Sequence, residues 1–400
     1  MKNFILLAIL ASILNSCLEP LDSSTYGNHS KLLVVDGSIS NQPGPYTVKL
    51  TYSKENILDT VEYINDASVY IIDETSNEIG FTLTDDGTYS SPVDFQAQIG
   101  KSYKLKIITH NPDNNYESSF CTIKEPSCIE NIGLKAGMAI DEINNKEEKA
   151  VVISIDASVC SNDETFLRWT IDEDWVFDLP TPLYYKMIGE SEFDYNTDVI
   201  KSCYQHDRMQ GITLYSFKNQ ASNQIIGNNI YAVPISSRRF SRRYRATIKQ
   251  HSISEEEFDY WRKLKDSSED TGDLFGKQPI GIESNITCTT NKDEKVLGYF
   301  QTSGITQQEI YVTTNKLKDL GLERYIRRDC IPDTISPSAT RTLYEQYLFL
   351  ETHSSMIFYR PLYDKMGMGV IGLLYTTPRC SSCDANQASA FPPENWIEKD

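Results

Sequence analysis

The most concentrated chemical feature of the sequence is a segment rich in arginine. Five arginines fall within the eight residues 238–245, in a chain whose formal net charge is −18. Guanidinium groups interleaved with aromatic rings can bind a carboxylated or sulfated glycan, a lipid headgroup or an acidic partner surface. The structural alternative, which we favour in a chain so rich in carboxylates, is an edge strand whose arginines pair with them and discourage aggregation. The candidate anion-binding residues are Arg238, Arg239, Arg242, Arg243 and Arg245.

Cysteine is the second residue type that could do chemistry. Eight cysteines follow position 17, and an even number in an exported chain indicates disulfides. Cys380-Ser-Ser-Cys383 could instead be a redox motif, which would need a thioredoxin-like βαβ setting that its surroundings do not supply. It could also hold zinc if Cys288 or Cys330 completed the site in space. We expect structural disulfides, and the candidates are Cys121, Cys128, Cys160, Cys203, Cys288, Cys330, Cys380 and Cys383.

Motifs for catalysis are hard to find. The five histidines are scattered without metal-binding spacing, and the sequence has neither a G-x-S-x-G nor a P-loop. The 56 acidic residues make carboxylate pairs so common that none can be nominated as the acid and nucleophile of a glycosidase. Asp172-Glu173-Asp174 could hold calcium, but we interpret it as a solvated acidic loop. We predict no metal and no cofactor, and the acidic composition argues against nucleic acid as a partner.

The N-terminus predicts export and a lipid anchor. Lys2 precedes an apolar run over residues 4–14, which is typical of a signal peptide and too short to span a bilayer. Leu14-Asn15-Ser16 before Cys17 resembles a bacterial lipobox, whose cysteine is acylated after residues 1–16 are removed. Residues 17–30 read as a flexible tether. Their acidic residues either direct the protein to the outer face of the outer membrane or belong to an unstructured tail.

The elements that must position these residues are mainly β. Residues 31–125 contain about seven short strand-like segments with regular turn signals, which predicts an immunoglobulin-like β-sandwich ending near Pro126. Residues 126–400 predict a larger β-rich domain with one or two helices. The clearest helix lies near residues 254–270, where Ser254 and Glu257 form a capping box and Phe258 and Trp261 begin an apolar stripe. The segment 344–350 is compatible with a helix or a strand.

Several landmarks, in order and spacing, resemble the family of unknown function numbered 4249, which consists of lipoproteins of Bacteroidetes-type bacteria. The landmarks are Leu33–Gly37, Leu167–Trp169, Phe258–Trp261, Glu269–Phe275, Asn285–Cys288, Val296–Phe300, and the terminal Cys380, Cys383, Pro393 and Trp396. The sequence departs from the family at Asp384-Ala385-Asn386, where a basic, glycine-rich stretch is usual. The resemblance implies an outer-membrane lipoprotein facing the exterior, in a family commonly associated with TonB-dependent transporters and without an established activity.

We therefore expect a non-enzymatic, surface-exposed outer-membrane lipoprotein that binds a ligand or acts as an accessory partner of a TonB-dependent transporter. The alternative from another class is a cell-surface glycan-active hydrolase that uses carboxylates of the second domain. A third possibility is a structural or assembly role without a small ligand.

Overall fold

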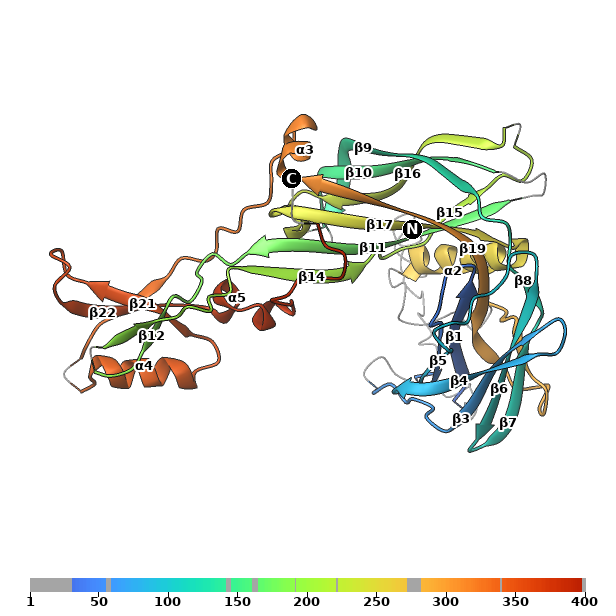
Figure 1. The fold of residues 1–400 in the computed structure, drawn as a ribbon, viewed down its shortest axis with the longest axis horizontal. Helices are drawn as coiled ribbons and strands as arrows, with labels where there is room; N and C mark the ends of the chain where they lie inside the picture. Colours follow the sequence, from blue (N-terminus) through green and yellow to red (C-terminus); the bar gives the residue numbers. More distant parts are fainter. Residues whose placement is uncertain are drawn as a thin grey trace, which may run out of the picture.

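The computed structural model describes residues 31–54, 59–141, 145–159, 165–190, 192–220, 222–271, 282–338 and 340–397. The predicted signal peptide, Cys17 and the tether lie outside the described residues. The chain is mainly β, as predicted, and it has three parts: an N-terminal sandwich, a central sandwich and an arm that projects from the central sandwich (Figure 1).

The N-terminal sandwich has an immunoglobulin-like order of strands. One sheet runs β1-β2-β5-β4 and the other runs β3-β6-β7, which matches the two sheets of a constant-type immunoglobulin domain. Strand β4 pairs with both β5 and β3 and so passes from one sheet to the other. This order confirms the predicted sandwich class. The strands are β1 (Leu33–Ser40), β2 (Thr47–Tyr52), β3 (Ala67–Asp73), β4 (Glu78–Asp85), β5 (Thr88–Ser90), β6 (Ser102–His110), β7 (Asp113–Ser118) and β8 (Cys121–Thr122).

Strand β6 shows why this part of the sequence folds as it does. Tyr103, Leu105 and Ile107 alternate with polar residues and all three are buried in the core. The intervening Lys104 and Lys106 lie on the other face of the sheet, because successive strand residues point to opposite sides. Lys104 forms an ion pair with Glu117 of the neighbouring strand β7, and Lys106 forms one with Glu78 of β4. The alternation along β6 thus places apolar side chains in the core and charged side chains on the outer face.

Residues 31–125 do not complete this sandwich by themselves. Strand β18 (Ile286–Cys288) pairs with β7, and the first half of β19 (Val296–Thr313) pairs in parallel with β1. Their side chains enter the same core. Gly298 permits the close approach of β19 to β1, because it has a φ of +92° and a Cβ there would lie 1.8 Å from the Val35 carbonyl oxygen. The chain boundary predicted near Pro126 is therefore not a boundary in packing.

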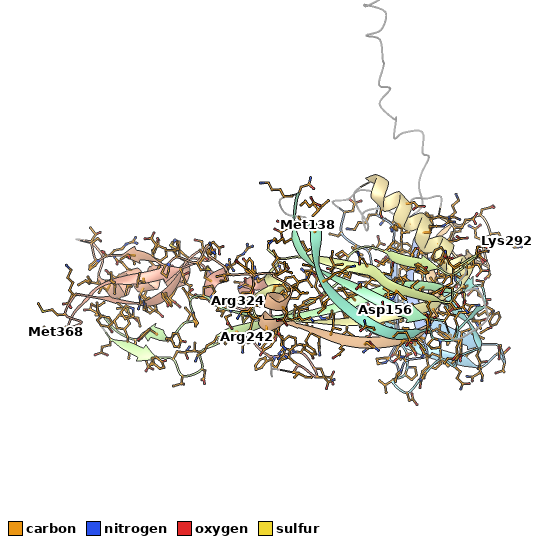
Figure 2. All side chains as sticks on the ribbon, turned by 90° about the horizontal axis from the view of Figure 1, so that it is seen from above. Met138, Asp156, Arg242, Lys292, Arg324 and Met368 are labelled. Carbon is orange, nitrogen blue, oxygen red and sulfur yellow. A yellow bond between two sulfur atoms is a disulfide. The ribbon has the colours of Figure 1, made fainter. Side chains whose placement is uncertain are left out.

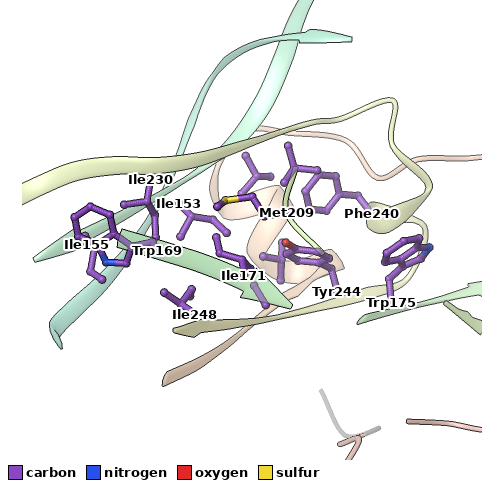
Figure 3. Close-up of a cluster of buried hydrophobic side chains, with 14 of the residues drawn as sticks. Ile153, Ile155, Trp169, Ile171, Trp175, Met209, Ile230, Phe240, Tyr244 and Ile248 are labelled. Atoms are coloured by element: carbon purple, nitrogen blue, oxygen red, sulfur yellow. The ribbon is translucent and has the colours of Figure 1, made fainter. Parts of the chain in front are cut away.

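The central sandwich packs two sheets against each other. The sheet β14-β11-β17-β19 carries β15 beside β11 and faces the three-stranded sheet β16-β10-β9. Figure 3 shows the core between them, where Trp169, Ile171 and Ile248 meet Ile153 and Ile155. The strands are β9 (Cys128–Asp141), β10 (Lys146–Ser158), β11 (Phe166–Asp178), β14 (Ser202–Arg208), β15 (Thr213–Ser216), β16 (Gln224–Pro234) and β17 (Arg243–Ile253).

The predicted helix is present as α2 (Glu255–Thr271). Its N-terminus is capped as expected, since the Glu257 N–H donates to Ser254 Oγ at 3.2 Å. The Glu257 side chain does not complete the capping box. It is buried and accepts hydrogen bonds from Trp261 Nε1 and the Thr302 N–H, both at 3.3 Å. Phe258 packs on Phe166 with ring centroids 5.1 Å apart, so the helix packs against β11.

The arm is built from two chain segments far apart in sequence. Its elements are β12 (Tyr185–Met187), β13 (Phe193–Tyr195), β20 (Asp333–Ile335), α4 (Leu343–Thr352), β21 (Ile357–Tyr363) and β22 (Val370–Thr376). They share a small core around Tyr347, Phe358 and Leu373. Helix α4 settles the ambiguous segment 344–350, and with α3 (Thr314–Asp319) and α5 (Pro378–Ser381) the described residues hold more helices than predicted. None of these helices is long and apolar enough to cross a bilayer.

Candidate functional site: an arginine-lined cavity at the waist

The arginine segment begins as the 3-10 helix η2 (Arg238–Phe240) and continues as β17. Strand β17 is paired on both sides, with β11 and with β19. The segment is therefore central in its sheet, and the expectation of an edge strand is wrong. The expected pairing with carboxylates is present for Arg239, Arg242 and Arg245.

Arg239 and Arg245 are structural. Arg239 donates from Nε and Nη2 to the two oxygens of Glu173, at 2.9 and 2.8 Å, and its guanidinium lies 4.7 Å from the centre of the Trp175 ring. Burial acts to lower the pKa of Arg239, but the hydrogen bond and charge of Glu173 raise it above the ordinary value. Arg245 pairs with Asp174 at 2.7 Å. The buried carboxylates of β11 thus neutralise Arg239 of η2 and Arg245 of the neighbouring strand β17.

These pairs also correct the interpretation of Asp172-Glu173-Asp174 as a solvated acidic loop. All three residues belong to β11, and Glu173 and Asp174 are buried. Asp172 pairs with Arg208 and Lys249. The acidic run is therefore a row of ion-pair partners within a sheet, and its charges are matched by basic residues on the flanking strands β14 and β17 and on η2.

The remaining arginines of the segment have different surroundings. The guanidinium of Arg243 is buried and lies 5.0 Å from the centre of the Tyr311 ring. Arg242 is exposed and pairs with Asp178 at 3.3 Å. Arg238 is half-buried, lies 4.9 Å from the centre of the Phe177 ring, and donates from Nη1 to the neutral Asn386 Oδ1 at 2.7 Å. The polar partner of Arg238 is therefore a neutral amide.

Arg238 opens onto a cavity of about 200 Å³ at the waist between the central sandwich and the arm. In Figure 2 the labelled Arg324 and Arg242 lie in this narrow region. The cavity is lined by Phe177, Asp178, Pro180, Arg238, Ser241, Arg324, Tyr325, Ile326 and Arg327. Burial lowers the pKa of Arg238, and the positive charges of Arg327 and Arg379 lower it further. Like charges thus converge on this cavity from two separate segments of an acidic chain, one with Arg238 and one with Arg324 and Arg327.

The sequence reasoning missed Arg324 and Arg327. Arg327 donates to both oxygens of Asp329, at 2.7 and 3.1 Å, and to the Arg379 carbonyl oxygen at 3.1 Å. Arg324 is exposed and forms no ion pair with any described residue. A signal was present, because residues 324–328 read Arg-Tyr-Ile-Arg-Arg and repeat the basic and aromatic mixture of residues 238–245.

Two disulfides hold the waist together. Cys330 is bonded to Cys380 and Cys203 to Cys383, so each cysteine of the C-x-x-C joins a distant part of the chain. Their sulfurs are consumed in these bonds and cannot serve as thiolate ligands of zinc. The candidacy of Cys128 stays a prediction, as does that of Cys160, which lies outside the described residues.

Cys121 and Cys288 are not disulfide-bonded, contrary to expectation. Each thiol has polar neighbours of its own in the N-terminal sandwich. Cys288 Sγ lies 3.3 Å from Thr290 Oγ1, and Asn285 Nδ2 donates to Cys121 Sγ at 3.4 Å. The even cysteine count therefore overstated the number of bridges.

The described residues offer little to the competing chemistries. They contain no group of three or more His, Cys, Asp or Glu placed to hold a metal ion. Gly367-x-Gly369-x-x-Gly372 fits the dinucleotide-binding pattern in letters. It lies at the turn from β21 into β22 and not between a strand and a helix, so it cannot cradle a pyrophosphate in the usual way.

That turn is the second notable feature, and it lies at the far end of the arm, where Figure 2 labels Met368. Asp364 Oδ1 accepts hydrogen bonds from the N–H groups of Met366 and Met368, both at 3.0 Å. The Asp364 N–H donates to the Gly369 carbonyl oxygen at 2.8 Å. The backbone is thus ordered, yet Met366 and Met368 are 80% and 82% exposed.

The profile of the family described as Domain of unknown function (DUF4249) matches residues 19–309. The chain belongs to this family. The DUF4249 match covers the N-terminal sandwich and most of the central sandwich, and it ends before Arg324, the main segment of the arm and the terminal cysteines. No curated protein matches the chain.

Proposed function

We propose that this DUF4249 member is a non-enzymatic lipoprotein, anchored through Cys17 to the outer face of the outer membrane, that serves as an accessory partner of a TonB-dependent transporter. The observation that carries the proposal is the arm. Its tip presents two exposed methionines on an ordered turn. Exposed apolar side chains that stand close together can mark a site of protein association.

Methionine suits such a contact. Its unbranched thioether side chain adapts to an irregular apolar surface and is common where proteins bind one another. Because hydrogen bonds to Asp364 already order the turn, binding would immobilise little backbone and lose little conformational entropy. The tip is therefore suited to insert into an apolar recess of a larger membrane protein.

The hydrolase alternative receives less support. A glycosidase of the usual type needs two carboxyl groups, about 5–10 Å apart, across one binding site. The waist cavity is lined by a single carboxylate, Asp178, and that group is paired with Arg242. The arginines that dominate the cavity suit binding of an anion better than protonation of a glycosidic oxygen.

The test is co-purification from the outer membrane of the bacterium that expresses the protein. The full chain carries a C-terminal tag, the membrane is solubilised in mild detergent, and the recovered proteins are identified by mass spectrometry. We expect a TonB-dependent transporter in comparable amount with the wild-type chain. Recovery of the lipoprotein alone, under conditions that preserve other membrane complexes, would overturn the proposal.

Two variants make the test specific to the arm. The double substitution Met366→Ser/Met368→Ser should reduce recovery of the transporter, because it removes the apolar tip. The control is Ile226→Ser, which changes an equally exposed apolar residue (82%) on strand β16 of the central sandwich. Equal recovery with the arm variant and the control would show that the arm is not the contact.

A further inference from the structure

We propose that the waist cavity is a binding site for a small organic anion, a carboxylate or phosphate group carried on a compact body such as a sugar. This site is independent of the transporter contact, because it lies at the waist and not at the tip of the arm (Figure 2). Three properties of the cavity favour such a ligand: its charge, the way its arginines are held, and its walls and size.

Charge is the first point. Among the arginines that line the cavity, Arg327 is neutralised by Asp329, and the one lining carboxylate, Asp178, is occupied by Arg242 outside the cavity. Arg238 has a neutral amide as its partner, and Arg324 has no ion-pair partner among the described residues. Two positive charges at one opening are therefore left without a counter-charge. The half-buried guanidinium of Arg238 in particular favours a ligand that supplies one.

Preorganisation is the second point. The guanidinium of Arg238 is fixed between the face of Phe177 and the hydrogen bond from Nη1 to Asn386. A guanidinium has five N–H donors, so most of those of Arg238 stay available to a ligand. Planar oxyanions such as carboxylates and phosphates match the fork of donors that arginine presents. Arg238 can thus bind an anion without being reordered first.

The walls and the volume define the rest of the ligand. Phe177, Pro180, Tyr325 and Ile326 contribute apolar and aromatic surface beside the arginines. The volume of about 200 Å³ is below the range of about 300–1,000 Å³ that is typical of sites for larger organic ligands. The cavity therefore suits one acidic sugar unit or a molecule of similar size, with its charged group on the arginines and its less polar face on Tyr325.

The experiment is calorimetric titration of the full-length lipoprotein in detergent. The probes are glucuronate, glucose 6-phosphate, glucose and inorganic phosphate, which separate the carboxylate, the phosphate, the sugar body and the bare anion. We expect at least one of the two charged sugars to bind, more tightly than glucose and more tightly than inorganic phosphate, and to bind more weakly as salt is added. Whichever charged sugar binds more tightly identifies the preferred acidic group.

Variants locate the binding. Arg238→Gln and Arg324→Gln should each weaken it by about 10- to 100-fold, since each removes a charged donor. Asn386→Asp should have the same effect with every arginine retained, because it gives Arg238 an internal counter-charge. The matched control is Arg262→Gln, which alters an exposed arginine of helix α2 that neither lines the cavity nor pairs with a residue that does.

The results that would overturn the site are definite. They are the absence of binding by both charged sugars at up to about 10 mM, equal affinity for glucose or for inorganic phosphate, or equal weakening by Arg262→Gln. A chain that recovers the transporter but binds neither charged sugar would refute this site and leave the proposed function intact. A chain that binds a charged sugar but recovers no transporter would refute the proposed function and leave this site intact.

Discussion

Replacing Arg239 by methionine tests whether the arginine segment is chiefly structural. The substitution keeps much of the side-chain length but removes the charge opposite Glu173, which is fully buried. Glu173 would retain hydrogen bonds from the hydroxyl groups of Tyr244 and Tyr231, at 2.7 and 3.2 Å, and would lose both bonds from Arg239. A carboxylate would then be buried without a counter-charge between two packed sheets.

The expected loss in the free energy of unfolding follows from this unpaired charge. Removing one partner of a buried ion pair typically costs about 3–5 kcal/mol, because the remaining charge has lost its solvent and its partner. Glu173→Gln should cost less, about 1–3 kcal/mol, because Arg239 keeps Asp207 at 3.0 Å and is 20% exposed. The double variant should be more stable than Arg239→Met alone, since its glutamine carries no stranded charge.

The assay is urea unfolding followed by tryptophan fluorescence. Two of the four tryptophans, Trp169 and Trp175, are buried in the core that contains the pair, so the signal reports on this sandwich. Arg242→Met is the control, and its exposed pair with Asp178 should contribute less than about 1 kcal/mol. A loss below about 1 kcal/mol for Arg239→Met, or a double variant less stable than both single variants, would refute the reasoning.

Three further predictions concern titration and the cysteines. Burial raises the pKa of Glu257 to about 7, so between about pH 4.5 and 7 the folded protein keeps a proton that the unfolded chain releases. The stability of the protein therefore falls as the pH rises through this range, and Glu257→Gln should make the melting temperature less dependent on pH there. The double substitution Cys330→Ser/Cys380→Ser removes the bridge that closes a span of 50 residues, which contributes about 4 kcal/mol through the entropy of the unfolded chain. Limited proteolysis of this variant should cut the arm before the sandwiches, and an arm as resistant as that of the wild type would contradict the prediction. Burial raises the pKa of the Cys121 thiol, so iodoacetamide should modify it slowly in the native protein and rapidly in urea, as mass spectrometry would show.

Local patterns predicted those parts of the fold that neighbouring residues determine. The alternation along β6 and the capping residue of α2 both led to the correct element, because burial and capping are decided within a few positions. Closure of the N-terminal sandwich could not be predicted in this way. Leu33 pairs with Val296, and no local signal marks a parallel pairing over such a separation. The three-residue strand β18 is too short to show a period at all.

The arginine segment shows how far the sequence could go toward the site. Its composition indicated a special role but could not show which arginines are structural and which line a cavity, because the partners that decide this are distant in the chain. Strand alternation sends Tyr244 to Glu173 in the core and Arg245 to Asp174 on the opposite face. Arg238 precedes this strand, lies in the 3-10 turn and meets Asn386, which is 148 positions away. Only the fold reveals that one arginine in five lines the cavity.

The two disulfides hold the residues around Arg238 in place at the waist. Arg327 lies three residues before Cys330, and Asn386 lies three residues after Cys383, so the two bridges hold both neighbours of Arg238 in place. The bridges themselves carry no charge and do not line the cavity. Reduction should therefore weaken binding of the charged sugar while leaving Arg238 chemically unchanged, and reoxidation should restore it. A cavity that binds equally well after reduction would show that packing of the aromatic wall alone is enough to preserve the site.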